Sequence, residues 1–153
     1  MLFKALKKAS TLITTTTLLG VISSLSTILL ISTHANAAEL TVNIKNINKM
    51  QGHLMLAMFK NEESYKQGDA VKSAKIKVTK NQEKIVFSNI AEGEYAIKLI
   101  QDENDNNKFD TNMLGIPKEA YGFSNNGGQF GQPDYKDAKF NVKDNTAIDI
   151  NLF

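Results

Sequence analysis

The chain has 153 residues, of which 42% are hydrophobic, 22% charged and 8% aromatic. This composition is typical of one globular domain and excludes a disordered or fibrous protein. The absence of cysteine excludes disulfides, thiolate metal sites, a cysteine nucleophile and a lipoprotein anchor. The two histidines, His34 and His53, are too few for a histidine-rich metal site. Because no catalytic triad is evident either, we expect a protein that is not an enzyme.

The N-terminal segment has the three parts of a secretory signal peptide. Three lysines lie among the first eight residues, an apolar stretch covers 18–31, and Ala35-Asn36-Ala37 has the small-x-small pattern that a signal peptidase reads. We predict cleavage after Ala37, export by the general secretory route, and a periplasmic or secreted protein. The alternative is an uncleaved membrane anchor. Serines and threonines interrupt the apolar stretch, however, and a membrane span needs ~20 consecutive apolar residues.

Residues 38–153 would form the working domain, and their charge differs from that of the whole chain. Without the three N-terminal lysines, fifteen lysines stand against sixteen acidic residues, which gives a formal charge of about −1. The chain also contains no arginine, the residue that most often reads bases in DNA. We therefore expect no nucleic-acid partner.

Apolar residues alternate with polar ones through most of this domain, which predicts short β-strands rather than helices. Turn signals such as Gly52, Glu92-Gly93 and Asp144-Asn145 separate the strands. Together they favour an all-β fold, an antiparallel β-sandwich of about seven strands. The seven expected strands cover 40–44, 53–59, 74–78, 85–87, 95–99, 138–142 and 147–152.

Two segments depart from the strand pattern. Residues 61–66 are the single helix candidate, with Asn61 as its N-cap. The segment 102–137, between the fifth and sixth expected strands, shows no convincing strand and is rich in glycine. It is too apolar for a free linker, so we predict an ordered loop lobe whose apolar side chains cover one end of the sandwich. The alternative for its aromatic side chains is a stacking surface for a sugar ring or a peptide.

The lobe begins with an acidic loop, residues 102–110, whose spacing matches a calcium-binding loop. Counted from Asp102, the side chains of Asn104, Asn106 and Asp110 stand at the third, fifth and ninth positions. Lys108 stands at the seventh, where the backbone carbonyl is the ligand. The loop therefore predicts a Ca²⁺ site of low affinity.

The match is partial. Asn107 stands at the turn position usually held by glycine, and Met113 replaces the glutamate expected at the twelfth position. Glu119 is the candidate for the missing carboxylate. No amphipathic helix flanks the loop, so it is not an EF-hand. The alternative is a loop without metal, because Asp and Asn side chains build turns by bonding their own backbone.

Three motifs together resemble a family of small secreted bacterial proteins known as domain of unknown function 2141. They are Ile90-Ala-Glu-Gly-Glu-Tyr-Ala-Ile97, the acidic loop, and Leu114-Gly-Ile-Pro-Lys-Glu-Ala-Tyr-Gly-Phe-Ser-Asn125. The Gly-x-Tyr part of the first motif is also similar to transthyretin-like and carboxypeptidase-regulatory-type sandwiches. The resemblance implies an exported β-sandwich with no established activity.

Three functions remain open on the sequence. The first is a non-catalytic exported module, stabilised by calcium, that binds a cell-envelope or extracellular partner through the lobe. The second is a small-ligand carrier of transthyretin type, which needs an apolar pocket. The third is a hydrolase using two of the carboxylates of Asp102, Asp105, Asp110 and Glu119.

Overall fold

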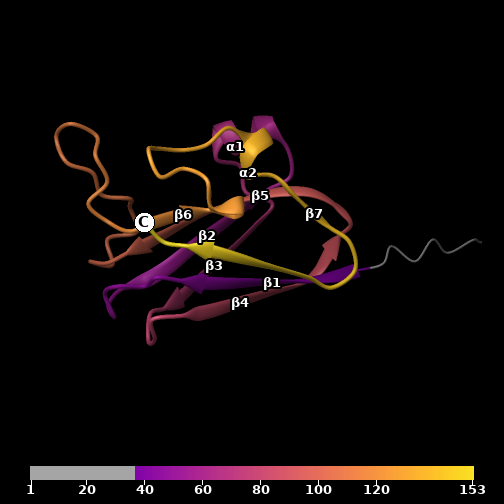
Figure 1. The fold of residues 1–153 in the computed structure, drawn as a ribbon, viewed down its shortest axis with the longest axis horizontal. Coiled ribbons are helices and arrows are strands. Elements are labelled where there is room, and N and C mark those ends of the chain that lie inside the picture. The colour runs from indigo at the N-terminus through magenta and orange to yellow at the C-terminus, as the bar shows by residue number, and fades with distance from the viewer. Residues whose placement is uncertain (1–36) are drawn as a thin grey trace, which may run out of the picture. The chain divides into compact units, whose positions relative to one another are not determined.

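A computed structural model describes residues 37–153, which form two β-sheets and a loop lobe (Figure 1). The first sheet has the order β4-β1-β8, and the second has the order β3-β2-β5-β6, with β7 paired to the start of β5. The strands are β1 (Ala37–Lys45), β2 (His53–Phe59), β3 (Lys72–Lys77), β4 (Glu83–Ala91), β5 (Gly93–Asp102), β6 (Tyr121–Phe123), β7 (Phe140–Val142) and β8 (Thr146–Asn151). The predicted all-β sandwich is confirmed, and all seven expected strands are present.

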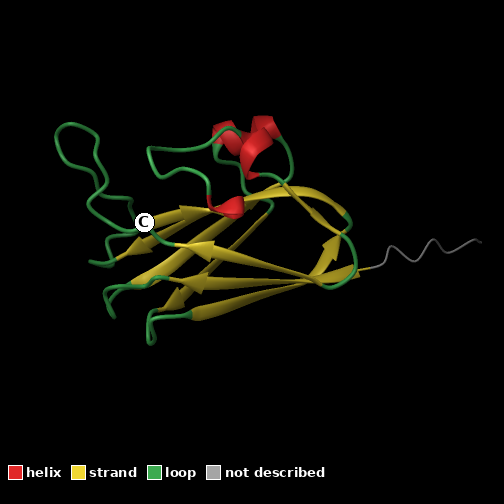
Figure 2. Ribbon diagram, viewed as in Figure 1, coloured by secondary structure: helices red, strands yellow, loops and turns green. Residues whose placement is uncertain are grey.

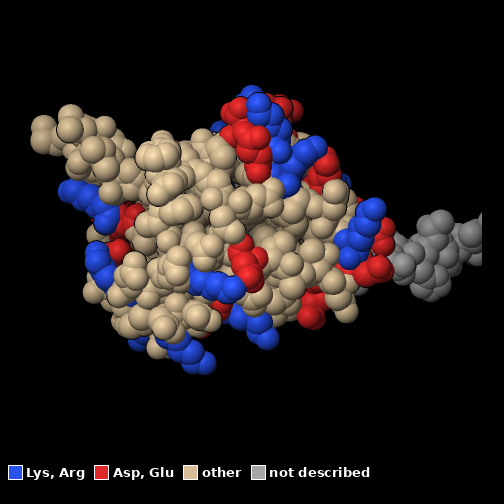
Figure 3. Space-filling model, viewed as in Figure 1, with Lys and Arg blue, Asp and Glu red and all other residues tan. Residues whose placement is uncertain are grey.

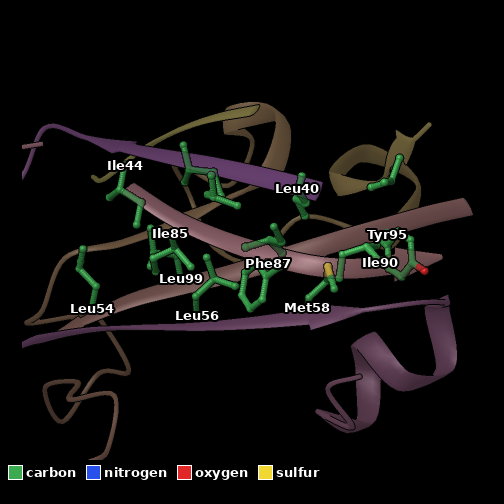
Figure 4. Packing of buried hydrophobic residues seen from close by; sticks show 14 of the residues in the cluster. Leu40, Ile44, Leu54, Leu56, Met58, Ile85, Phe87, Ile90, Tyr95 and Leu99 are labelled. Carbon is green, nitrogen blue, oxygen red and sulfur yellow. The ribbon is translucent and has the colours of Figure 1, made fainter. Parts of the chain in front are cut away.

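The core lies between the two sheets and follows from the alternation in the sequence. Leu40, Val42 and Ile44 of β1 are fully buried, while Thr41 and Asn43 between them are partly exposed. Side chains of both sheets meet in the interior (Figure 4). At roughly 25 cal/mol per Å² of apolar surface, burial of this cluster is the main stabilising contribution to the fold.

The first sheet differs from the expected antiparallel arrangement at one pair of strands. β1 pairs antiparallel with β4, placing Val42 opposite Ile85, but it pairs parallel with β8, placing Val42 opposite Ile148. Parallel neighbours need a long connection. Since β1 and β8 are the first and last strands of the described chain, the rest of the domain supplies that connection.

The predicted helix is confirmed as α1 (Glu62–Gln67), which begins at the N-cap Asn61. The Asn61 side chain accepts a hydrogen bond from the Ser64 backbone, and the Ser64 side chain accepts one from the Asn61 backbone, which makes a capping box. Tyr65 of α1 is buried edge-on against Phe59, with ring centres 5.5 Å apart. The helix therefore covers a second, smaller core beyond the end of β2.

The lobe contains more secondary structure than the sequence predicts. β6 lies inside the segment expected to have no strand, and it pairs with β5. The segment also holds a 3-10 turn, η1 (Ser124–Asn126), and a short helix, α2 (Tyr135–Ala138), which Figure 2 shows on the same side as α1. The sixth expected strand is correspondingly shorter, because residue 138 ends α2. A Cβ at Gly122 would lie 2.8 Å from the Asn151 carbonyl oxygen, so only glycine lets β6 lie this close to the end of β8.

The predicted signal peptide, residues 1–37, lies outside the described residues except for Ala37. Among residues 37–153, the structure contains no helix that is long and apolar enough to cross a membrane.

Gly52 packs closely against the backbone at the start of the acidic loop, and its substitution tests this contact. Its φ is +68°, and a Cβ there would lie 1.9 Å from the Asp102 carbonyl oxygen. We expect Gly52→Ala to lower the free energy of unfolding by about 3 kcal/mol or more, because backbone strain adds to a clash between backbones. Gly68→Ala is the control, since Gly68 also has positive φ but an added Cβ there has no neighbour within 4 Å. It should lose only about 1 kcal/mol. Urea unfolding measures both, and equal losses would contradict the close packing.

Candidate functional site

The acidic loop is organised around Asp102, the last residue of β5, whose side chain is fully buried. One carboxylate oxygen accepts a hydrogen bond from the Asn106 backbone N–H at 3.0 Å, and the other accepts one from the Asn107 N–H at 2.9 Å. The Lys75 ammonium lies 3.7 Å from the second oxygen. A buried carboxylate needs such partners, because leaving it unpaired in the interior is strongly unfavourable. Asp102 therefore fixes the course of the loop that follows it.

Two asparagines give the loop its turns. The Asn104 side-chain oxygen accepts a hydrogen bond from the Asn106 N–H at 3.1 Å, and the Asn106 oxygen accepts one from the Lys108 N–H at 2.8 Å. The side-chain amides of both asparagines donate to one carboxylate oxygen of Asp110, at 2.7 and 3.0 Å. Asn107 has φ +60°, which confirms its predicted place at a left-handed turn.

Glu119 lies far along the chain but joins both ends of the loop. Its carboxylate is only 6% exposed, and each oxygen accepts one backbone hydrogen bond at 2.9 Å, from Glu103 and from Asp110. These two bonds hold the start and the end of the loop at a fixed separation. Glu119 therefore lies against the loop, and its predicted role as a metal ligand stays a prediction.

The structure places the five predicted metal-ligand side chains in one hydrogen-bonded network. Lys108 contributes its backbone N–H rather than a carbonyl contact. Within residues 37–153, no group of three or more His, Asp or Glu side chains is placed to hold a metal ion. The side-chain oxygens described above accept hydrogen bonds from the loop itself, so the loop is ordered by its own contacts. Calcium binding stays a prediction.

Three neighbours of the loop were not identified from the sequence. His53 of β2 contacts the Asp105 carboxylate, Lys49 pairs with Glu103 at 2.5 Å, and Lys75 donates to the Asn107 side chain at 2.6 Å. The register of the strands is the signal that would have identified His53. His53 stands opposite Asp102 across β2 and β5, and so at the base of the loop.

Beyond the loop, residues 110–118 form a hairpin with an apolar tip. Met113 is fully exposed, Leu114 is 83% exposed and Ile116 is 55% exposed. Phe130, in the next loop of the lobe, is also fully exposed. The expectation that these side chains cover the core is therefore wrong for these four residues, although Phe123 and Tyr135 of the same lobe are buried. Figure 1 shows the hairpin projecting from the sheets at the end where β5 meets the lobe.

Two hollows lie beside these features. A cleft of about 420 Å³ with a mixed polar and apolar lining lies at the base of the hairpin, and its lining includes Lys49, Ile116, Tyr121, Gln129 and Phe153. A largely apolar groove of about 380 Å³ lies on the outer face of β2, β3 and β5. Its lining includes Met55, Ala57, Ala74, Lys75, Lys98 and Ile100.

The fold and this site define the class of protein: an all-β sandwich that carries a loop lobe fixed by buried carboxylates. The family model described as "Uncharacterized protein conserved in bacteria (DUF2141)" matches residues 42–150, and the chain belongs to this family. Neither the curated proteins nor the solved structures compared with it give a match. The resemblance to domain of unknown function 2141 is confirmed, whereas the resemblance to transthyretin-like sandwiches stays a prediction.

The two hydrogen bonds of Glu119 make a direct prediction about the lobe. Glu119→Gln replaces one acceptor oxygen with an amide that cannot accept, so one buried backbone N–H loses its partner. We expect the free energy of unfolding to fall by about 1–3 kcal/mol. Limited proteolysis should also cleave the segment 103–118 faster. Glu63→Gln is the control because Glu63 is exposed on α1, and it should change stability by less than about 0.5 kcal/mol. An unchanged Glu119→Gln variant would show that these bonds do not hold the loop.

Proposed function

We propose that this protein is an exported, non-catalytic module that binds a component of the cell envelope through the tip of its lobe. The observation that carries the proposal is the hairpin 110–118, which exposes Met113 and Leu114 on an ordered loop. Exposed contiguous apolar side chains are unfavourable in water and mark interaction sites in soluble proteins. The predicted signal peptide supports export, since it would place this tip in contact with envelope components.

The state of the carboxylates favours binding over hydrolysis. Of the four candidate residues, Asp102 and Glu119 are buried and accept hydrogen bonds from backbone N–H groups. Asp105 contacts His53 instead. A glycoside hydrolase needs two carboxyl groups facing an open substrate site. Two of the four are therefore already used to hold the lobe.

The apolar groove supports a second candidate function, a carrier of small amphipathic ligands. Met55, Ala57 and Ile100 supply an apolar floor, and Lys98 lies at one side of the groove. Burial lowers the pKa of Lys98, whose ammonium donates to the Tyr65 carbonyl at 2.6 Å and lies 4.2 Å from the Tyr65 ring centre. Saturable binding of a fatty acid that Met55→Glu abolishes would favour this function over the first.

Retention on the cell envelope tests the first function. We expect the wild-type protein to sediment with an isolated envelope fraction and Met113→Asp to remain in the supernatant, because a charge at the tip opposes burial of apolar surface. Met50→Asp is the matched control, since Met50 is also an exposed methionine but lies outside the lobe. Retention that Met50→Asp and Met113→Asp reduce equally would contradict binding through the lobe.

We further propose that calcium binds the acidic loop beneath the tip. The amides of Asn104 and Asn106 converge on one oxygen of Asp110. Rotating either amide by half a turn would present its oxygen there, at the expense of the hydrogen bond that this oxygen accepts from a backbone N–H of the loop. Water molecules would complete the six to eight oxygen ligands that Ca²⁺ takes. With few charged ligands, the dissociation constant should be about 10⁻⁴–10⁻³ M, the range of extracellular modules.

A calcium titration followed by thermal unfolding tests this site. At a calcium concentration about ten times the dissociation constant, binding adds roughly 1.4 kcal/mol to the stability of the folded state. The melting temperature should then rise by about 3–6 °C. Asp110→Asn should remove the rise, whereas Asp69→Asn, an exposed aspartate outside the loop, should keep it. If the wild-type melting temperature does not change, the loop does not bind calcium.

A further inference from the structure

Most backbone donors at the apolar tip of the hairpin are paired within the hairpin itself. Asn112 lies at its base, and its side-chain oxygen accepts hydrogen bonds from the N–H groups of Leu114 at 2.9 Å and Ile116 at 3.0 Å. Its backbone carbonyl accepts one from Gly115 at 2.9 Å, and its own N–H donates to the Ile116 carbonyl at 2.8 Å. Unpaired backbone groups are what keep irregular loops out of hydrocarbon. Here the N–H groups of Leu114, Gly115 and Ile116 already have partners within the hairpin.

The charges around the hairpin follow a second pattern. Lys108 and Lys118 are exposed at the two arms, and the ion pairs formed across residues 37–153 include neither of them. The acidic neighbours Glu103 and Asp105 contact Lys49 and His53, and the carboxylates of Asp110 and Glu119 accept hydrogen bonds from the loop. In Figure 3 the projecting tip is free of charged side chains, and both lysine and acidic atoms lie at its base. An apolar tip flanked by exposed lysines that form no ion pair within the described chain is the pattern that an anionic lipid surface binds.

The shape of the tip argues for lipid rather than for a second copy of the chain. A stable protein interface buries about 1,200–2,000 Å² in total and needs complementary surfaces on both partners. The tip is convex and consists of the side chains of Met113, Leu114 and Ile116 at the end of one hairpin. Two such tips in contact would bury too little area, whereas a bilayer surrounds each inserted side chain.

A further apolar side chain is exposed in the turn beside the hairpin. Phe130 is fully exposed in the turn that a hydrogen bond from Gly131 N–H to the Gly128 carbonyl closes at 3.0 Å. Gln129 of this turn lines the same cleft as Ile116, so the turn and the hairpin are neighbours. Aromatic and aliphatic side chains are the types that anchor peripheral proteins in the membrane interface.

We propose that the hairpin 110–118 inserts its apolar tip into an anionic lipid bilayer, with Lys108 and Lys118 contacting the headgroups. The inference rests on the proposed function, because it identifies the envelope component bound by the lobe as lipid. Contact is peripheral and reversible, since a few side chains enter the bilayer and no segment crosses it.

Tryptophan fluorescence tests insertion at the tip itself, because the chain contains no tryptophan. Leu114→Trp places a single reporter at the tip, and Met50→Trp places one at an exposed site outside the lobe. With phosphatidylcholine vesicles containing about one third phosphatidylglycerol, we expect the emission of Leu114→Trp to shift to shorter wavelength. Lipids brominated on their acyl chains should quench it. The emission of Met50→Trp should stay unchanged. No shift for Leu114→Trp, or equal shifts for both, would overturn the proposal.

Vesicle sedimentation measures the contributions of the tip and of the lysines. Leu114→Asp should weaken vesicle binding at least about tenfold. Lys108→Gln and Lys118→Gln should each weaken binding about fivefold, and only on anionic vesicles. Unchanged binding of Leu114→Asp would overturn the proposal. Retention on the envelope fraction without binding to lipid vesicles would also overturn it while leaving the proposed function intact. A dimer in solution that Leu114→Asp dissociates would assign the tip to self-association instead.

Discussion

The loop lobe depends on two buried carboxylates, those of Asp102 and Glu119. Asp102 accepts backbone hydrogen bonds from the middle of the acidic loop, and Glu119 accepts them from both of its ends. A buried carboxylate is stable only when charge or hydrogen bonds compensate for its lost hydration, so each can be buried only with the loop in place. The loop and the carboxylates therefore stabilise each other, and an asparagine-rich segment gains a defined shape without regular secondary structure.

Local patterns in the sequence predict most of the sandwich. A strand buried on one face needs alternating apolar residues, which is why β1 and β8 are evident from Leu40, Val42 and Ile150 alone. α1 is equally local, since its N-cap and its capping box lie within four residues. The left-handed turn at Asn107 is also predictable locally, because asparagine tolerates positive φ better than most residues. In each case a few neighbouring residues contain the whole signal.

Features that depend on distant partners are not visible in this way. β6 is three residues long and is defined by pairing with Leu99 and its neighbours on β5, and Gly122 is required there only because β8 ends against it. The parallel pairing of β1 with β8 is likewise a property of the assembled sheet. The exposure of Met113 and Leu114 is the largest departure from the predicted packing. Hydrophobicity alone predicts burial, whereas the hydrogen bonds of Asn112 close the hairpin on itself and its apolar side chains remain exposed.

Because the hairpin is already ordered by its own hydrogen bonds, its small apolar tip can bind without first being folded. Binding loses affinity when flexible segments must be ordered first, and a few inserted side chains offer little apolar surface to offset that loss. In this chain Glu119 fixes the base of the loop and Asn112 fixes the tip before any partner arrives. The same argument gives calcium a limited role. An ion bound between Asn104, Asn106 and Asp110 would strengthen a base that is already ordered, so it should raise stability more than it changes the shape presented at the tip.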